Sequence, residues 1–118
     1  MKKSKVIEIG KKLLKKHGLE DWKITIGELE VYLISPIFAG CNYEYKEIRI
    51  NRDFINLMTE KDVRGTVLHE IVHALVRAPD KSKEFQKVCK KIKAPLTQEE
   101  VMSPGRRQEF IKSFWRIR

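Results

Sequence analysis

The sequence predicts an α+β fold: a small antiparallel or mixed sheet packs on an N-terminal helix and a long central helix, and further C-terminal helices follow. Three observations lead to this prediction. A length of 118 residues provides for one core and leaves little room for a second. Apolar residues alternate with polar ones in several runs within residues 22–51, as in half-buried strands. From residue 60 onward, apolar residues recur at helical spacing instead.

The first half of the chain is expected to hold a helix over residues 5–17 and a sheet over residues 22–51. The helix is amphipathic, and Gly18 is the residue type that favours a helix end. Three runs rich in β-forming residues are expected to pair as antiparallel strands. These runs are Trp22–Ile26, Val31–Ile34 and Lys46–Asn51.

The second half is expected to be helical. Thr59-x-x-Asp62 resembles a capping box and begins a long helix over residues 60–78, which Pro79 stops. A following helix is expected over residues 82–93, and a capping box at Thr97-x-x-Glu100 begins a short one. We therefore predict a single domain over residues 1–105 and a basic, amphipathic tail over residues 106–118.

Composition excludes several classes of protein. No apolar run approaches the ~18 residues that a membrane span requires, and the N-terminus lacks the apolar region of a secretory signal. Cys41 and Cys89 match neither a disulfide framework nor a Cys-x-x-Cys zinc ribbon. We therefore expect a cytoplasmic protein with no membrane partner and with both thiols reduced and buried.

The net charge of +9 is concentrated at the two ends of the chain. Residues 1–16 hold seven Lys and one Glu, a net charge of +6, and residues 106–118 hold five basic residues and one Glu, a net charge of +4. Basic ends suit contact with DNA phosphates through counterion release. A solvated helix face that keeps the protein soluble is the equally weighted alternative.

One stretch carries a chemical motif. His69-Glu70-x-x-His73 has the form H-E-x-x-H, and on a helix its two histidines lie one turn apart on the same face. Glu70 lies about 100° around the helix, within reach of a water bound to a metal that the histidines hold. Zinc lowers the pKa of such a water, so Glu70 can act as the general base in peptide hydrolysis.

The alternative is a core helix whose two histidines are satisfied by hydrogen bonds. The arrangement of apolar residues favours the metal site, because they form one arc and leave the three polar side chains together outside it. The residues of this arc are Leu68, Ile71, Val72 and Leu75.

Motifs around this stretch resemble those of the SprT-like zinc metallopeptidases, the group that includes the Spartan proteases. The resemblance runs from Trp22 to about Ile92. The motifs that carry it are a Trp-led strand, Ala39-Gly40-Cys41-x-Tyr43, Lys46-x-Ile48-x-Ile50-Asn51, Val63-x-x-Thr66-x-Leu68-His69-Glu70-x-x-His73-Ala74-Leu75 and Glu84-Phe85-Gln86-Lys87. It implies a small sheet above an active-site helix and Zn²⁺ held by three histidines. For Spartan-type members it also implies cleavage of proteins bound or crosslinked to DNA.

The sequence departs from the family pattern at the third zinc ligand. Family members supply it from His-Gly-x-x-aromatic, and aligning the aromatic with Phe85 places Lys81 where the histidine belongs. An ammonium group does not bind zinc, so we expect Asp80 to complete the site, because a one-residue shift of the loop brings it into position. A helix N-cap is the competing role for Asp80. The other candidates for the third ligand are His17, Glu84, Glu99, Glu100 and Glu109.

We therefore expect a zinc-dependent metallopeptidase that cleaves protein or peptide substrates, with DNA-associated proteins as the class that the resemblance implies. Two alternatives stay open. In the first, the chain is a decayed peptidase scaffold that binds nucleic acid, an alternative that Lys81 and the basic ends favour. In the second, it is a latent enzyme whose tail around Trp115 blocks the cleft. The zinc ribbon that many family members carry is missing, so any DNA contact would fall to the basic ends.

Overall fold

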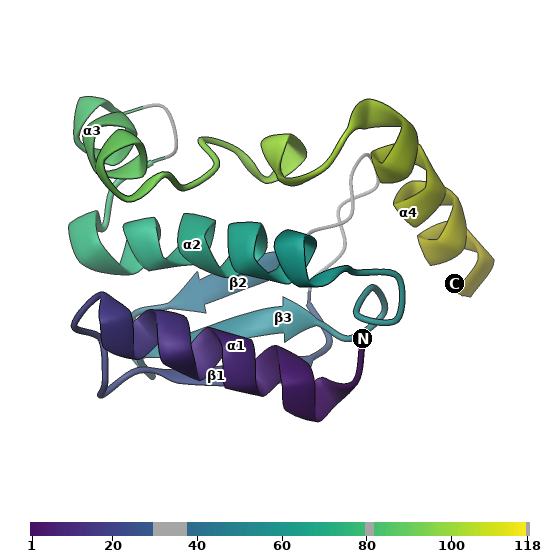
Figure 1. Ribbon diagram of the computed structural model, residues 1–118, viewed down its shortest axis with the longest axis horizontal. Coiled ribbons are helices and arrows are strands. Elements are labelled where there is room, and N and C mark those ends of the chain that lie inside the picture. The colour runs from purple at the N-terminus through teal and green to yellow at the C-terminus, as the bar shows by residue number, and fades with distance from the viewer. Residues whose placement is uncertain (30–37, 80–81, 118) are drawn as a thin grey trace.

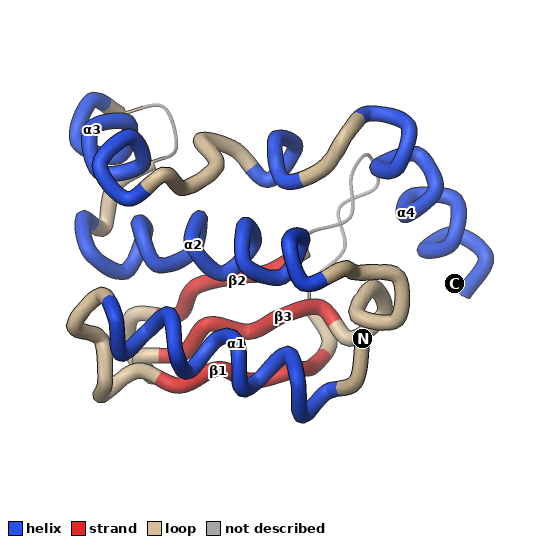
Figure 2. Tube along the Cα trace, in the orientation of Figure 1, coloured by secondary structure: helices blue, strands red, loops and turns tan. Residues whose placement is uncertain are grey.

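The computed structural model describes residues 1–29, 38–79 and 82–117, and it confirms the predicted α+β fold (Figures 1 and 2). The helices are α1 (Lys3–Lys16), α2 (Glu60–Val76), α3 (Lys83–Ile92), the 3-10 helix η1 (Gln98–Val101) and α4 (Pro104–Ile117). The strands are β1 (Lys23–Gly27), β2 (Ala39–Asn42) and β3 (Glu47–Asn51). None of the described helices is long and apolar enough to cross a lipid bilayer.

The strands form a mixed sheet in the order β1-β3-β2. A tight turn joins β2 to β3, and this pair is antiparallel, whereas β1 runs parallel to β3 with Lys23 opposite Glu47. The mixed alternative is therefore correct and the fully antiparallel one is wrong, because β3 inserts between β1 and β2 and runs in the direction of β1. The expected strand Val31–Ile34 lies outside the described residues.

Helices α1 and α2 lie side by side on one face of the sheet, with α1 against β1 and α2 against β2 and β3 (Figure 1). A Cβ atom at Gly10 would lie 2.5 Å from a side-chain carbon of Ile24, so only glycine allows α1 to approach β1 this closely. Helix α3 and η1 pack on α2 from the side away from the sheet. Helix α2 is therefore enclosed by structure on both sides.

The ends of α2 have identifiable causes. The predicted capping box is present, because the Thr59 hydroxyl accepts from the Asp62 N–H at 3.3 Å and an Asp62 carboxylate oxygen accepts from the Thr59 N–H at 2.9 Å. The helix ends at Val76 rather than at residue 78. Arg77 takes a left-handed conformation with a φ of 49° and a ψ of 44°, and Pro79 disfavours a helical residue before it.

Helix α3 begins and ends one residue inside the expected range of 82–93. Ser82 is its N-cap, with the hydroxyl accepting from the Phe85 N–H at 3.2 Å, and Lys93 closes it in a left-handed conformation. The expected capping box at Thr97 is wrong, since the Thr97 side chain makes no capping bond. The Glu100 carboxylate instead accepts from the Leu96 N–H at 3.0 Å, and η1 is a single 3-10 turn.

The two terminal helices also differ from the predicted bounds. Helix α1 begins at Lys3, because Lys2 serves as an extended N-cap, and it ends at Lys16, where His17 is the C-cap. Gly18 follows with a φ of 75°, the conformation for which glycine is favoured. Helix α4 begins at Pro104, ahead of the predicted tail at 106, and proline suits the first position of a helix.

Helix α4 is held against the beginning of α2. The Arg106 guanidinium contacts both carboxylate oxygens of the buried Asp62, at 2.9 and 2.7 Å, and donates to the Leu57 carbonyl at 3.1 Å. The hydrogen bond to Asp62 raises the pKa of Arg106, so the guanidinium stays charged. One turn later, the Phe110 ring is buried against Phe38 and Phe54.

Replacing Arg106 should therefore destabilise the fold. Arg106→Gln leaves the buried Asp62 carboxylate without its ionic partner, and we expect the free energy of unfolding to fall by about 1–3 kcal/mol. Lys112→Gln, an exposed lysine of the same helix, is the matched control and should change it by less than ~0.5 kcal/mol. Urea denaturation followed by circular dichroism measures both. Equal values for the two variants would contradict the assigned role of Arg106.

Candidate metal centre

The second half of α2 places three polar side chains together inside the molecule. His69 and Glu70 are buried and His73 is half-buried, and the ligand atoms of the three lie within 4.8 Å of one another. Among the residues that the structure describes, this is the one group of three or more His, Cys, Asp or Glu side chains that could hold a metal ion. All three residues of the H-E-x-x-H motif therefore meet at one place.

Each imidazole ring is oriented by a hydrogen bond between its Nδ1 atom and a backbone carbonyl. His69 Nδ1 lies 2.9 Å from the Pro95 oxygen, and His73 Nδ1 lies 3.1 Å from the Ala78 oxygen. A carbonyl oxygen only accepts hydrogen bonds, so Nδ1 is the protonated nitrogen in both rings. The lone pair of each neutral imidazole is then on Nε2, which is the arrangement of metal-binding histidines anchored through their second nitrogen.

An aromatic ring from α3 packs against both imidazoles. The centroid of the buried Phe85 ring lies 5.2 Å from that of His69 and 4.5 Å from that of His73, and the two imidazole centroids are 5.0 Å apart. Phe85 offers no polar atom, so it restricts the rotation of both rings without competing for a ligand nitrogen. Ser82 fixes Phe85 in turn by capping the first turn of α3.

Strand β2 and the residue that follows it bring a thiol, Cys41, and a phenol, Tyr43, to the same region. Burial, followed by the charge of Glu70, raises the pKa of Cys41 to about 12, and Arg77 opposes this shift. Burial is also the main cause of the raised pKa of Tyr43, with contributions from Cys41 and Glu70. The expectation of two buried thiols is correct for Cys89 but wrong for Cys41, which is half-buried because β2 is at the edge of the sheet.

The donor set fits a zinc ion. Two imidazole Nε2 atoms and a neighbouring carboxylate are the nitrogen and oxygen donors that Zn²⁺ binds in proteins. The described residues do not assign a third protein ligand, because the expected Asp80, like Lys81, lies outside them. The side chain of Glu99 also lies outside them.

The other candidates for the third ligand are exposed, bind elsewhere or end a helix. Glu84 is exposed in the first turn of α3, and Glu109 is exposed on α4. Glu100 binds the Leu96 N–H, and His17 is the C-cap of α1, where burial and the neighbouring Lys16 lower its pKa. None of these four belongs to the described His-Glu-His group.

The apolar arc expected on α2 is only partly correct. Ile71 and Val72 are fully buried, but Leu75 is 41% exposed and Leu68 is only partly buried. The prediction assumed that α2 buries one face, whereas α2 packs against the sheet and α1 on one side and against α3 on the other. The polar stripe of the motif lies within this enclosed region, which is why His69 and Glu70 are buried.

Sequence reasoning did not identify the groups that hold the imidazoles. Pro95 and Ala78 contribute through backbone carbonyls, so their side chains carry no chemical indication of the role. The one usable indication was the position of two prolines, Pro79 and Pro95, just after the ends of α2 and α3. Phe85 and Tyr43 belong to the motifs that carry the family resemblance, but the sequence alone assigns neither residue a role at the site.

Comparison with known proteins matches the chain to one family model and to two solved structures of similar fold. The model of the SprT-like family matches residues 2–104 of the chain. The fold is similar to that of the metallopeptidase zymogen jannalysin of Methanocaldococcus jannaschii, with a TM-score of 0.60 and 16% identity over 96% of this chain and 97% of that chain. It is also similar to the metallopeptidase zymogen abylysin of Pyrococcus abyssi, with a TM-score of 0.52 and 19% identity over 97% and 92% of the two chains. No curated protein matches the chain.

The proximity of Cys41 to Glu70 can be tested by alkylation. With its pKa raised from 9.0 to about 12, the native Cys41 thiol should carry about 1,000-fold less thiolate at pH 8 than an unfolded one, and iodoacetamide should react correspondingly slowly. Glu70→Gln removes a negative charge that raises this pKa, so alkylation of Cys41 should become faster.

Mass spectrometry of protein treated with a chelator would follow the Cys41 and Cys89 peptides separately. The Cys89 peptide is the internal control, since a general loosening of the fold would accelerate both. An unchanged rate at Cys41 in Glu70→Gln would contradict the placement of the two side chains.

Proposed function

The chain belongs to the SprT-like family, and on this basis we propose that it is a zinc-dependent peptidase that hydrolyses protein or peptide substrates. The observation that carries the proposal is the pairing of both imidazole Nδ1 atoms with backbone carbonyls beside a buried carboxylate. Such pairing is expected of two metal ligands and is not required of two incidental core histidines. The similarity of the fold to two metallopeptidase zymogens supports the same reaction type.

In this proposal His69 and His73 hold the metal through Nε2, and Asp80 is our first candidate for the remaining protein ligand. Zinc, when bound, would supply a Lewis acid that makes a water molecule acidic enough to lose a proton near neutral pH. Glu70 accepts that proton as general base and returns it to the leaving amine as general acid. Because the Glu70 side chain is buried, its carboxylate is shielded from exchanging the proton with bulk solvent.

DNA-associated proteins are the substrate class that we propose within this function, with basic surface outside the site attracting the DNA. The cytoplasmic location expected from composition stays a prediction. The proposal of a latent enzyme has no described contact in its favour. Arg106 and Phe110 hold the tail at the beginning of α2, and the side chain of Trp115 is outside the described residues.

Replacing the general base should separate metal binding from catalysis. Glu70→Gln removes the proton acceptor but neither imidazole, so we expect about one zinc per chain to be retained while peptide cleavage falls by about 10²–10⁴-fold. Glu44→Gln, an exposed carboxylate in the turn between β2 and β3, is the matched control and should retain both.

Elemental analysis of protein purified without chelators gives the zinc content, and cleavage of an unfolded protein substrate gives the rate. Cleavage by Glu70→Gln at a rate near that of the native sequence would refute the role of Glu70. Absence of zinc from the native sequence, even after zinc is added, would refute the peptidase proposal as a whole.

A second candidate function, nucleic-acid binding on a decayed peptidase scaffold, is favoured by one surface. All lysines of α1 are exposed, and the only acidic residue of this helix, Glu8, is already shared between Lys5 and Lys12 at 3.8 and 3.3 Å. This leaves Lys11, Lys15 and Lys16, among others, to meet a phosphate backbone. The face of α1 that carries these side chains is directed to solvent, since its apolar side packs on the sheet and α2.

Exchanging lysines tests whether this surface binds DNA. Replacing Lys11, Lys15 and Lys16 with Gln should weaken binding to a short DNA duplex and reduce the slope of log affinity against log salt by about 2–3, because each neutralised phosphate contributes about 0.9 to it. The same three changes at Lys83, Lys87 and Lys90 of α3 remove equal charge elsewhere and serve as the control. An equal loss of DNA affinity in both triple variants would contradict a binding surface on α1, because it would show attraction by net charge only.

A further inference from the structure

The backbone carbonyl of His73 accepts two hydrogen bonds. One comes from the Arg77 N–H at 2.8 Å and closes the last turn of α2. The other comes from the Tyr43 hydroxyl at 3.0 Å, and it joins the end of strand β2 to this turn across 30 residues of sequence. A tyrosine that directly follows strand β2 therefore binds the same residue whose imidazole belongs to the candidate metal centre.

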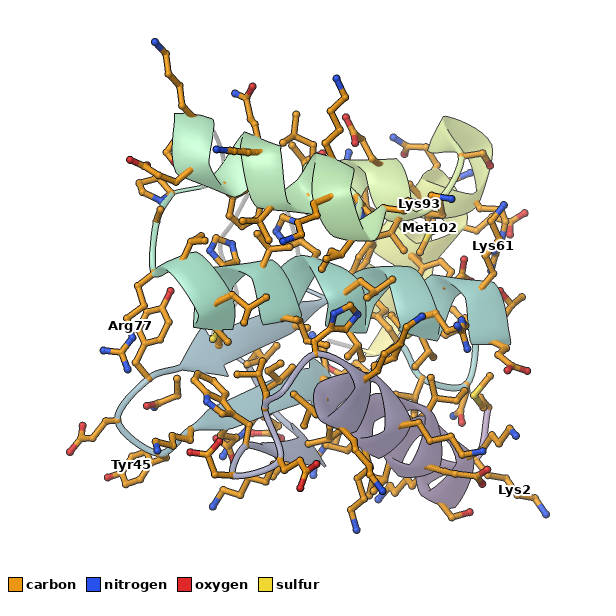
Figure 3. All side chains as sticks on the ribbon, turned by 60° about the vertical axis from the view of Figure 1, so that its left-hand side comes forward. Lys2, Tyr45, Lys61, Arg77, Lys93 and Met102 are labelled. Atoms are coloured by element: carbon orange, nitrogen blue, oxygen red, sulfur yellow. The ribbon has the colours of Figure 1, made fainter. Side chains whose placement is uncertain are left out.

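The Tyr43 ring is itself held between two side chains. The Trp22 ring meets it edge-on at a centroid distance of 6.3 Å, and the Arg77 guanidinium carbon lies 4.9 Å from its centroid on a cation–π contact. Arg77 lies at the end of α2, on the side of the molecule where Tyr45 marks the turn after β2 (Figure 3). The Tyr43 hydroxyl can only donate in its bond to the His73 carbonyl, because a carbonyl oxygen is an acceptor.

Arg77 links this contact to the His73 ring. Its left-handed conformation is unusual for a residue with a side chain, and such a conformation persists only where surrounding contacts maintain it. The reversal at Arg77 turns the chain back, so that the next carbonyl, that of Ala78, lies 3.1 Å from His73 Nδ1. In this conformation the guanidinium lies over the Tyr43 ring, and this contact favours the reversal.

We propose that Tyr43 is a positioning residue for the metal centre, which holds the His73 backbone through its hydroxyl and the Ala78 carbonyl through Arg77. This inference rests on the proposed function, because it assigns His73 as a ligand. His69 provides an internal comparison, since Pro95 from the loop after α3 orients its ring and Tyr43 has no part in that bond. A residue that only fills the core would affect both histidines alike.

The experiment uses Tyr43→Phe, which retains the ring and its contacts with Trp22 and Arg77 but removes the hydroxyl. Tyr45→Phe is the matched control, because Tyr45 is 64% exposed. Competition with a chromophoric chelator should show zinc affinity reduced by about tenfold for Tyr43→Phe and unchanged for the control, as for other residues that orient a metal ligand. The visible absorption spectrum of the cobalt-substituted protein should also change for Tyr43→Phe, since it reports the geometry of the ligands.

Arg77→Gly provides a second variant, because glycine adopts the left-handed conformation readily but lacks the guanidinium. It should weaken zinc binding less than Tyr43→Phe, since the chain reversal and the Tyr43 hydroxyl both remain. Unchanged zinc affinity and an unchanged cobalt spectrum in Tyr43→Phe would overturn the positioning role. So would an equal loss in Tyr45→Phe.

A measurement on the metal-free protein separates this inference from the proposed function. Nitrogen-15 NMR can follow solvent exchange of the Nδ1 protons of His69 and His73. In Tyr43→Phe we expect the His73 proton to exchange about tenfold faster and the His69 proton to be unaffected. If the native protein binds no zinc but only the His73 proton responds, the peptidase proposal fails and the positioning of His73 by Tyr43 stands. If both protons respond equally or neither responds, the positioning role fails.

Discussion

Two hydrogen bonds from imidazole rings to backbone carbonyls connect the candidate site to the rest of the molecule. A buried N–H group that lacks an acceptor costs more free energy than a single contact supplies, so the acceptors must be held in place. The bond from His69 to Pro95 fixes the loop after α3, and the Cys89 thiol, 3.6 Å from the same carbonyl oxygen, adds a weak second donor. The position of α3 over α2 is thereby coupled to the orientation of a single imidazole ring.

Helix α2 contributes to two separate apolar clusters, and the motif lies between them. One cluster joins α1, the sheet and the inner side of α2, and the other joins Val72 to Phe85 and Cys89 of α3. A helix packed from both sides cannot shift by a fraction of a turn without opening a cavity in one cluster or overfilling the other. The three polar side chains of the motif are therefore presented by one of the most constrained parts of the chain.

The sequence predicted those parts of the fold that local physical rules determine. The capping box at Thr59 and Asp62 and the helix end marked by Gly18 are local events, and both are present. The prediction allowed a mixed sheet but did not say which strands pair in parallel, because the pairing of β1 with β3 depends on which strand occupies the centre of the sheet, and no local pattern records this. The exposure of Leu75 was missed for a related reason, since helical spacing does not reveal that α2 has partners on two sides.

At the candidate site, too, the sequence predicts what local geometry determines and not what the tertiary fold determines. Spacing alone placed His69, Glu70 and His73 together, because one helical turn determines their relation. The sequence does not indicate the carbonyls of Pro95 and Ala78, because every residue, proline included, offers the same backbone oxygen and only the tertiary fold selects which one is used. Asp80 was proposed from an alignment with a family motif, and that position is outside the residues that the structure describes.

The order of the elements along the chain has a consequence for when the two motif histidines become oriented during synthesis. Strand β1 leaves the ribosome early, yet among the described strands it pairs with β3 alone, and α1 must wait for α2 to cover its apolar side. The acceptor for His69 is made later still, 26 residues after the histidine. A nascent chain therefore carries all three described strands and both motif histidines before the loop that orients the first histidine is made. Under the proposed function, metal binding by an oriented pair of histidines would therefore come late in synthesis and would stabilise a nearly finished chain rather than nucleate its folding.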